Sequence, residues 1–206
     1  MKSRFLLVVF AAGALLARAG TIVQYTAGTT PGSGLAWGES LMTPVGGPWN
    51  NITFNFYSDA PAVTPAAAGN AFLLTQEYLG TPAALSSSTP GFLAESVSNA
   101  GGVYTFNSGV VINPGTEYWI YEDAVMSLTG SNVDGSATED LYDSVAATTN
   151  FASFSAGVVA NFTLSGTAAV PEPGTLYLSI CALIFALIPV YISRKKSSLK
   201  HASGHR

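Results

Sequence analysis

The chain has 206 residues, of which 48% are hydrophobic and 10% are charged, and its formal net charge at pH 7 is −4. Every Lys, Arg, His and Cys lies before residue 20 or after residue 170, so the segment between carries eleven acids and no basic side chain. That segment cannot hold a serine or cysteine triad, an ordinary zinc site, a lysine Schiff base or a phosphate clamp. Its charge near −11 also repels nucleic acid, which excludes nucleic acid as a partner.

Enzyme activity in this segment would have to rest on carboxylates alone. A glycosidase needs two carboxyl groups about 5–10 Å apart, and eleven acids offer many pairs without singling out one. Carboxylates in such sites usually have a basic neighbour, and this segment has none. We therefore predict a non-catalytic protein without a cofactor, apart from the calcium considered below.

The N-terminus has the three parts of a secretory signal peptide. Two basic residues precede an apolar run over residues 5–16, and Ala17-Arg18-Ala19 follows as an A-x-A cleavage site. An apolar run of about a dozen residues is too short for a membrane-spanning helix. We predict a signal peptide over residues 1–19 and an exported protein that begins at Gly20.

Residues 20–165 are predicted to form one extracytoplasmic all-β domain. The segment is rich in Thr, Val, Phe, Tyr, Gly and Ser, and turn-forming residues recur about every dozen positions. Apolar and polar residues alternate over Trp49–Tyr57, which predicts a strand with one buried face. Further strands are expected over Ala71–Leu79, Val103–Ile112, Glu117–Met126 and about Ala156–Leu164.

Long loops separate these strands, at Ser58–Asn70, Gly80–Gly91 and Ser127–Asp140. A tight turn is predicted between two strands at residues 113–116, because Pro114 presets φ and Gly115 supplies a positive φ. Short antiparallel strands joined by long loops are typical of an antiparallel β-sandwich of jelly-roll type.

The strand predicted over Glu117–Met126 is aromatic on both faces. Tyr118 and Ile120 share one face and Trp119 and Tyr121 the other, so one pair points outward or lies under a loop. Aromatic rings can stack on sugar rings, although they more often fill a sandwich core. Trp119 and Tyr121 are the candidate ligand contacts.

Four acids gather beyond this strand, at Asp134, Glu139, Asp140 and Asp143. Ca²⁺ accepts carboxylate ligands on flexible loops, and close carboxylates without a cation repel one another. The spacing does not match an EF-hand loop. These residues form a candidate calcium site, with a solvated loop as the alternative.

A linker at residues 166–175 contains Pro171, Glu172 and Pro173. Both prolines fix φ and lack an amide donor, so the backbone there is extended and no helix begins early. The next 17 residues, 176–192, carry no charge, which is near the lower limit for a membrane-spanning helix.

Arg194, Lys195 and Lys196 open a basic tail over residues 193–206. Basic residues directly after a span resist translocation and stay in the cytoplasm. The sequence therefore predicts one C-terminal transmembrane helix that leaves everything before it outside the inner membrane.

The order of Pro-Glu-Pro, span and basic cluster resembles the sorting tail of the PEP-CTERM family of exported bacterial proteins, over about a sixth of the chain. The resemblance implies that an exosortase-type membrane enzyme recognises Pro171, Glu172 and Pro173 and processes the chain nearby. The span would then be a temporary anchor. A permanent anchor with a proline-rich stalk is the alternative.

The pattern of a hydrophobic pair, Pro-Gly-Thr and Tyr-Trp over Val111–Trp119 resembles a hairpin of choice-of-anchor type sandwich bodies. The family resemblance also implies extracellular polysaccharide and biofilm as the setting. We expect an exported, non-catalytic protein of the cell surface or extracellular matrix, associated with exopolysaccharide. The alternative is a carbohydrate-binding module that uses exposed aromatics and calcium.

Overall fold

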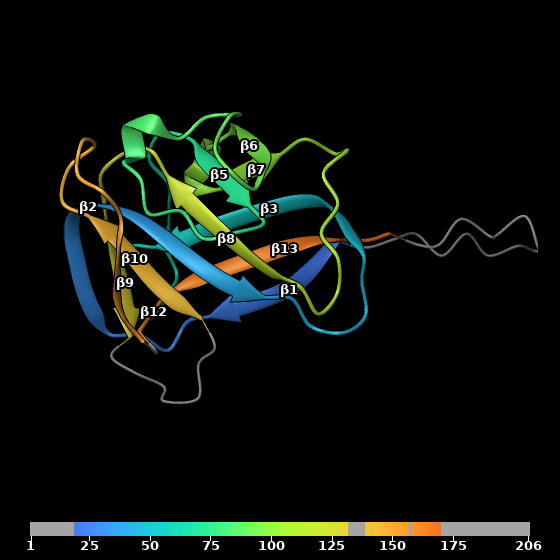
Figure 1. Ribbon diagram of the computed structural model, residues 1–206. Coiled ribbons are helices and arrows are strands. Elements are labelled where there is room, and N and C mark those ends of the chain that lie inside the picture. The colour runs from blue at the N-terminus through green and yellow to red at the C-terminus, as the bar shows by residue number, and fades with distance from the viewer. Residues whose placement is uncertain (1–18, 132–138, 157, 170–206) are drawn as a thin grey trace, which may run out of the picture. The chain divides into compact units, whose positions relative to one another are not determined.

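The structure is a computed structural model that describes residues 19–131, 139–156 and 158–169 (Figure 1). The chain divides between Ala169 and Val170 into two units, and the described residues all belong to the first. Residues 19–169 are here called the body. No helix within the described ranges is long and apolar enough to cross a membrane. The span expected at residues 176–192 lies outside these ranges.

The body is built from strands that pair only in antiparallel fashion, so the expected all-β class is confirmed. The strands are β1 (Ala19–Tyr25), β2 (Thr30–Met42), β3 (Trp49–Tyr57), β4 (Pro65–Ala66), β5 (Ala71–Leu74), β6 (Phe92–Ser98), β7 (Tyr104–Phe106), β8 (Glu117–Glu122), β9 (Met126–Ser131), β10 (Asp140–Ser144), β11 (Ala152–Ala156), β12 (Val159–Ala160) and β13 (Phe162–Ala168). Two short 3-10 helices accompany them, η1 (Pro82–Ala84) and η2 (Ala100–Gly102).

The strands form one curled sheet in the order β1-β13-β3-β7-β6-β5-β8-β2-β10-β11. The 13-residue strand β2 causes much of the curl, because its first half pairs with β9 and its second half with β8 and β10. Strand β9 also pairs with β12, which only Asn161 separates from β13. The chain thus passes from β12 directly into β13, and the sheet curls around the core.

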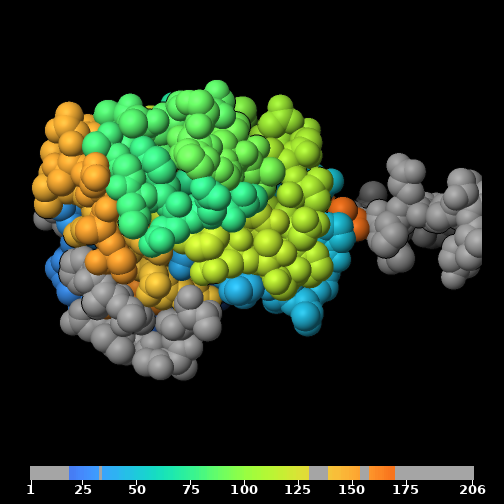
Figure 2. Space-filling model, viewed as in Figure 1, coloured from blue at the N-terminus to red at the C-terminus, as the bar shows by residue number. Residues whose placement is uncertain are grey.

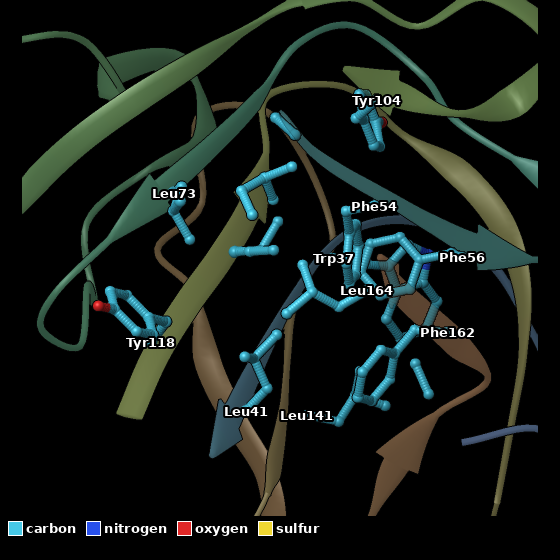
Figure 3. Packing of buried hydrophobic residues seen from close by; sticks show 14 of the residues in the cluster. Trp37, Leu41, Phe54, Phe56, Leu73, Tyr104, Tyr118, Leu141, Phe162 and Leu164 are labelled. Carbon is cyan, nitrogen blue, oxygen red and sulfur yellow. The ribbon is translucent and has the colours of Figure 1, made fainter. Parts of the chain in front are cut away.

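The main core lies inside this curl and is dominated by aromatic and aliphatic side chains (Figure 3). Alternate residues of β3, namely Ile52, Phe54 and Phe56, are buried there, as the pattern of Trp49–Tyr57 predicts. The Phe54 ring stacks on Phe162 of β13 at a centroid distance of 5.7 Å. Burying each such side chain contributes roughly 1.5–3 kcal/mol, so this face of the sheet holds much of the fold's stability.

Several predicted strands are present but shorter than expected. The second ends at Leu74, and the third is reduced to Tyr104–Phe106, in which Tyr104 and Phe106 are buried on one face. Gly115 has a φ of 60°, which confirms the turn. That turn does not close a hairpin, however, because β7 pairs with β3 and β6 while β8 pairs with β2 and β5.

Three boundaries differ from the prediction. The strand expected over Glu117–Met126 is two strands, β8 and β9, and β9 occupies part of the expected loop. Strand β13 continues to Ala168, beyond the boundary predicted at residue 165. Gly166 explains this error: a Cβ there would lie 2.9 Å from Ile22 and Ile52, so this glycine is packed inside the sheet and is not linker.

Candidate functional site

A second, smaller hydrophobic cluster covers the outer face of β2, β5, β8 and β10. Tyr121 and Tyr142 project from the sheet, and Tyr78 and Phe151 project from the segments 75–91 and 145–151 that lie over it. The two covering segments are bonded to each other, since the Phe151 amide donates to the carbonyl of Gly80 at 2.9 Å. The face that carries the two predicted ligand contacts is therefore largely covered.

Tyr121 is fully buried in this cluster, which corrects the prediction that it contacts a ligand. Its ring lies over Gly38, the residue opposite it on β2, where a side chain would overlap the ring. Its hydroxyl accepts a hydrogen bond from the Tyr78 amide at 3.1 Å. The sequence left two possibilities for the face that carries Trp119 and Tyr121: it points outward or lies under a loop. In the structure this face lies largely under loops.

Trp119 lies at the margin of the same cluster and is only half-buried. Its indole nitrogen donates to the hydroxyl of Tyr142 at 3.4 Å. Burial is the main reason that the pKa of Tyr142 is raised to about 12, and the neighbouring Glu77 adds to the rise. Trp119 is the part of the predicted aromatic pair that a ligand can still reach.

Carboxylates gather near Glu117, which lies on the same face of β8 as Trp119, two residues before it. Burial is the first cause of the raised pKa of Glu117, and the charges of Asp140, Glu139 and Glu77 raise that pKa further. Acids from three separate segments are therefore near enough to Glu117 to affect its pKa. A half-buried indole beside carboxylates and a phenol could bind the apolar face and hydroxyl groups of a sugar.

The calcium prediction gains no support from the geometry. Among the described residues no group of three or more His, Cys, Asp or Glu side chains could hold a metal ion. Asp140 and Asp143 stand an odd number of residues apart on β10 and so face opposite sides of the sheet. Glu139 directly precedes β10, and Asp134 lies outside the described residues.

Two fully buried acids were not among the predicted site residues: Glu39 and Glu122. Both face the main core, and no cation is available to pair with either, because the body contains no Lys, Arg or His. Burial is the largest cause that raises the pKa of Glu122 well above its usual range, although the Trp37 amide, which donates to the carboxyl group, acts in the other direction.

The hydroxyl of Tyr104 determines the protonation state of Glu122. Its oxygen lies 2.7 Å from both the amide nitrogen and the carbonyl oxygen of Ala68, and 2.8 Å from Oε2 of Glu122. A phenol has one hydrogen to donate. The Ala68 carbonyl can only accept, so the phenol hydrogen goes there and none remains for the carboxyl group. All three contacts are satisfied when Glu122 carries a proton and donates it to Tyr104.

Glu39 is in a similar position with fewer partners. Its Oε2 accepts a hydrogen bond from the Ala160 amide at 2.9 Å, while Oε1 has no partner among the described residues. Burial is the largest cause of its strongly raised pKa, and the charges of Glu139 and Asp140 raise the pKa further. One amide donor cannot offset the cost of burying a full charge, so Glu39 is also a neutral acid.

A sequence signal for both buried acids existed in the strand alternation. Glu122 has the same parity as the core residues Tyr118 and Ile120, and Glu39 has the parity of Trp37 and Leu41. Each acid therefore had to point inward once its strand formed.

The other predicted sites lie outside the described residues: the sorting motif Pro171, Glu172 and Pro173, the stop residues Arg194, Lys195 and Lys196, and Ala17 of the cleavage site. Ala19 is the first residue of β1 and is exposed. No family model, no curated protein and no solved structure matches the chain.

Proposed function

We propose that this chain is an exported, non-catalytic protein of the cell surface or extracellular matrix, delivered by a PEP-CTERM sorting tail and associated with exopolysaccharide. The observation that carries the proposal is the order of the Pro-Glu-Pro tripeptide, the uncharged run and the basic cluster, directly after a body without any basic residue. The localisation and the sorting enzyme both follow from that order.

The geometry of the body is in keeping with this proposal. Ala19 pairs with Thr167 across β1 and β13, so the predicted signal peptide and the sorting tail join the body at the same place. The acids that face the core are neutral, which leaves a body held together by apolar burial and backbone hydrogen bonds.

For the architecture we propose the jelly-roll-like sandwich. One layer would contain β1, β13, β3 and β7, and the other β5, β8, β2, β10 and β11. Strand β6 pairs with members of both layers, while β9 and β12 connect the layers at the opposite edge. The main core then lies between the layers.

The sorting proposal is tested in two matched bacterial hosts, one with and one without an exosortase-type enzyme. The full chain should lose its tail near residues 171–173 only in the host with the enzyme, and should then be recovered outside the inner membrane. The triple variant Pro171→Ala, Glu172→Ala, Pro173→Ala should stay at full length in the inner membrane. Ser197→Ala with Ser198→Ala is the control in the same tail and should be processed normally. Identical masses in the two hosts would reject the proposal.

The alternative function, carbohydrate binding, is favoured by one observation, the half-buried Trp119 on the same strand face as Glu117, near which other carboxylates gather. Retention of the protein on the host exopolysaccharide tests it, in millimolar calcium and again in chelator. Trp119→Leu should abolish retention, whereas Trp49→Leu, which changes another half-buried indole, should not. Equal retention of both variants would remove Trp119 from the candidates.

A further inference from the structure

The two chain ends of the body meet at one edge, which we name the exit end. Ala19 lies opposite Thr167 in the pairing of β1 with β13. The amide of Ala169 then donates to the carbonyl of Pro48 at 2.8 Å. The loop at residues 43–48 therefore lies where the chain leaves the body.

A second loop, residues 107–116, is bonded to the first. The Thr43 amide donates to the Thr116 carbonyl at 3.0 Å, and Trp49 and Ile112 exchange two backbone hydrogen bonds of 3.0 Å. Figure 2 shows the light-blue and yellow-green atoms of this region next to the orange end of β13. The exit end is therefore one continuous surface.

This surface carries no charged side chain. Neither residues 43–49 nor residues 107–116 include an acid or a base, and the same holds for residues 19–22 and 166–169. The nearest acid along the chain is Glu117, which follows the second loop and is half-buried. The exit end itself contributes no acid to the strongly negative body, and the acids that gather near Glu117 lie at its border.

The exit end also exposes apolar side chains. Val45, between Pro44 and Gly46 at the tip of the first loop, is 91% exposed, and Val111 in the second loop is 42% exposed. The half-buried indole of Trp49 packs against Gly47 of the first loop. Exposed valine beside an indole, without charge, is the combination that suits the boundary between lipid headgroups and acyl chains.

We propose that the exit end rests on the lipid surface of the membrane while the chain is anchored, with Val45 and Val111 among the headgroups. This inference depends on the proposed span at residues 176–192. The six residues 170–175 reach at most about 20 Å when extended, so the body is held beside the membrane.

The short tether strengthens a contact that would be weak on its own, because the local lipid concentration is high. Orientation follows from charge: anionic lipid repels the acidic parts of the body and does not repel the neutral exit end. The membrane would thus hold the body upright on its exit end.

The test places the full chain, with Cys181→Ser, in phosphatidylcholine vesicles that contain brominated lipid. A fluorophore is attached at Val45→Cys, at Val111→Cys or, as the control, at Val63→Cys. Val63 is 69% exposed in the loop after β3, at the other end of that strand from Trp49. Insertion to a depth of about 5–10 Å should reduce the fluorescence at positions 45 and 111 by about twofold or more and leave position 63 unchanged.

A charged substitution provides a second measurement. Val45→Glu should reduce the quenching at position 111, and Val63→Glu should not change it. If the chain floats with the vesicles but positions 45 and 63 are quenched equally, the proposed membrane contact is overturned. The proposed span is then unaffected. A chain that does not float with the vesicles would reject the span, and this inference with it.

Discussion

Glu122 and Glu39 resolve the problem of buried charge by protonation, because no basic side chain exists in the body to pair with them. A proton on Glu122 completes the bonds of Tyr104, and the Oε1 atom of Glu122 accepts from the Trp37 amide at 3.2 Å. Asp59 shows the opposite solution: its exposed carboxylate accepts bonds from Thr64 and Val63, which lower its pKa. The environment of each acid, and not its residue type, decides its charge.

Stability should fall as the pH rises, because the pKa of Glu122 in the folded body is raised well above the usual 4.5. The contribution of such a group is fully present below its unfolded pKa and is lost as the pH rises through its folded pKa. Urea unfolding at pH 5, 7 and 9 should therefore show a falling midpoint. Glu122→Gln keeps the neutral bonds and should flatten this dependence.

Glu95→Gln removes an exposed acid and is the control for these measurements. This variant should show the same pH dependence as the wild-type body. A midpoint that rises from pH 5 to pH 9 in the wild type would contradict a protonated Glu122.

Tyr104→Phe should destabilise the body by about 1–3 kcal/mol, because it leaves the buried Glu122 proton and both backbone groups of Ala68 without their partner. The free energy of unfolding in urea measures the loss. In the Glu122→Ala background, which lacks the bond to Tyr104, the two effects should not add, since both residues belong to one network. Additive losses would show that the hydroxyl and the carboxyl group act separately.

At the scale of the elements, β2 is the strand on which the other pairings depend. It pairs with β8, β9 and β10, and Gly38 lets the Tyr121 ring of β8 lie flat against it. A glycine inside a strand usually weakens it. Here the cross-strand ring covers the glycine, and the ring is in turn covered by Tyr78 and Phe151.

Gly38→Ala should cost about 1–3 kcal/mol, since the added methyl group overlaps the Tyr121 ring in a closely packed cluster. The urea midpoint measures the cost. Gly109→Ala is the matched control, because its Cβ would meet only Asn107, at an ordinary 3.5 Å. Equal midpoints for the two variants would show that the outer cluster adapts without cost.

At the scale of the whole molecule, the body carries acids with no balancing base. Besides the buried Glu39 and Glu122, nine acids remain, and several of them gather near Glu117. Salt bridges between side chains of the body cannot form, because it has no basic residue. Added salt therefore screens the repulsion between the acids and weakens no attractive charge pair.

Stability should therefore increase with ionic strength. The urea midpoint at about 0.5 M NaCl should exceed that at about 0.02 M, as the screening length shortens from about 20 Å to under 5 Å. Glu117→Gln removes one of the converging carboxylates and should reduce the salt effect. A midpoint that falls with salt would mean that attractive charge pairs stabilise the body.

The sequence by itself determined the features that depend on neighbours along the chain. Alternation placed Ile52, Phe54 and Phe56 on one buried face of β3, and a proline followed by a glycine determined the turn at Gly115. The absence of basic residues determined that buried acids would have no ionic partner. These features require only local geometry or composition, so they can be inferred without knowing which strands pair.

Only the tertiary structure decided which strands pair and which faces are covered. The division of β2 between partners, the burial of Tyr121 beneath residues 75–91 and the proton on Glu122 all depend on segments far apart in the chain. Alternation shows on which face of a strand a side chain lies, but not what covers that face. Tyr121 was therefore predicted as a ligand contact, and the burial of Glu122 was not predicted. Long-range packing, which the local pattern does not encode, determines whether a face meets solvent or another layer.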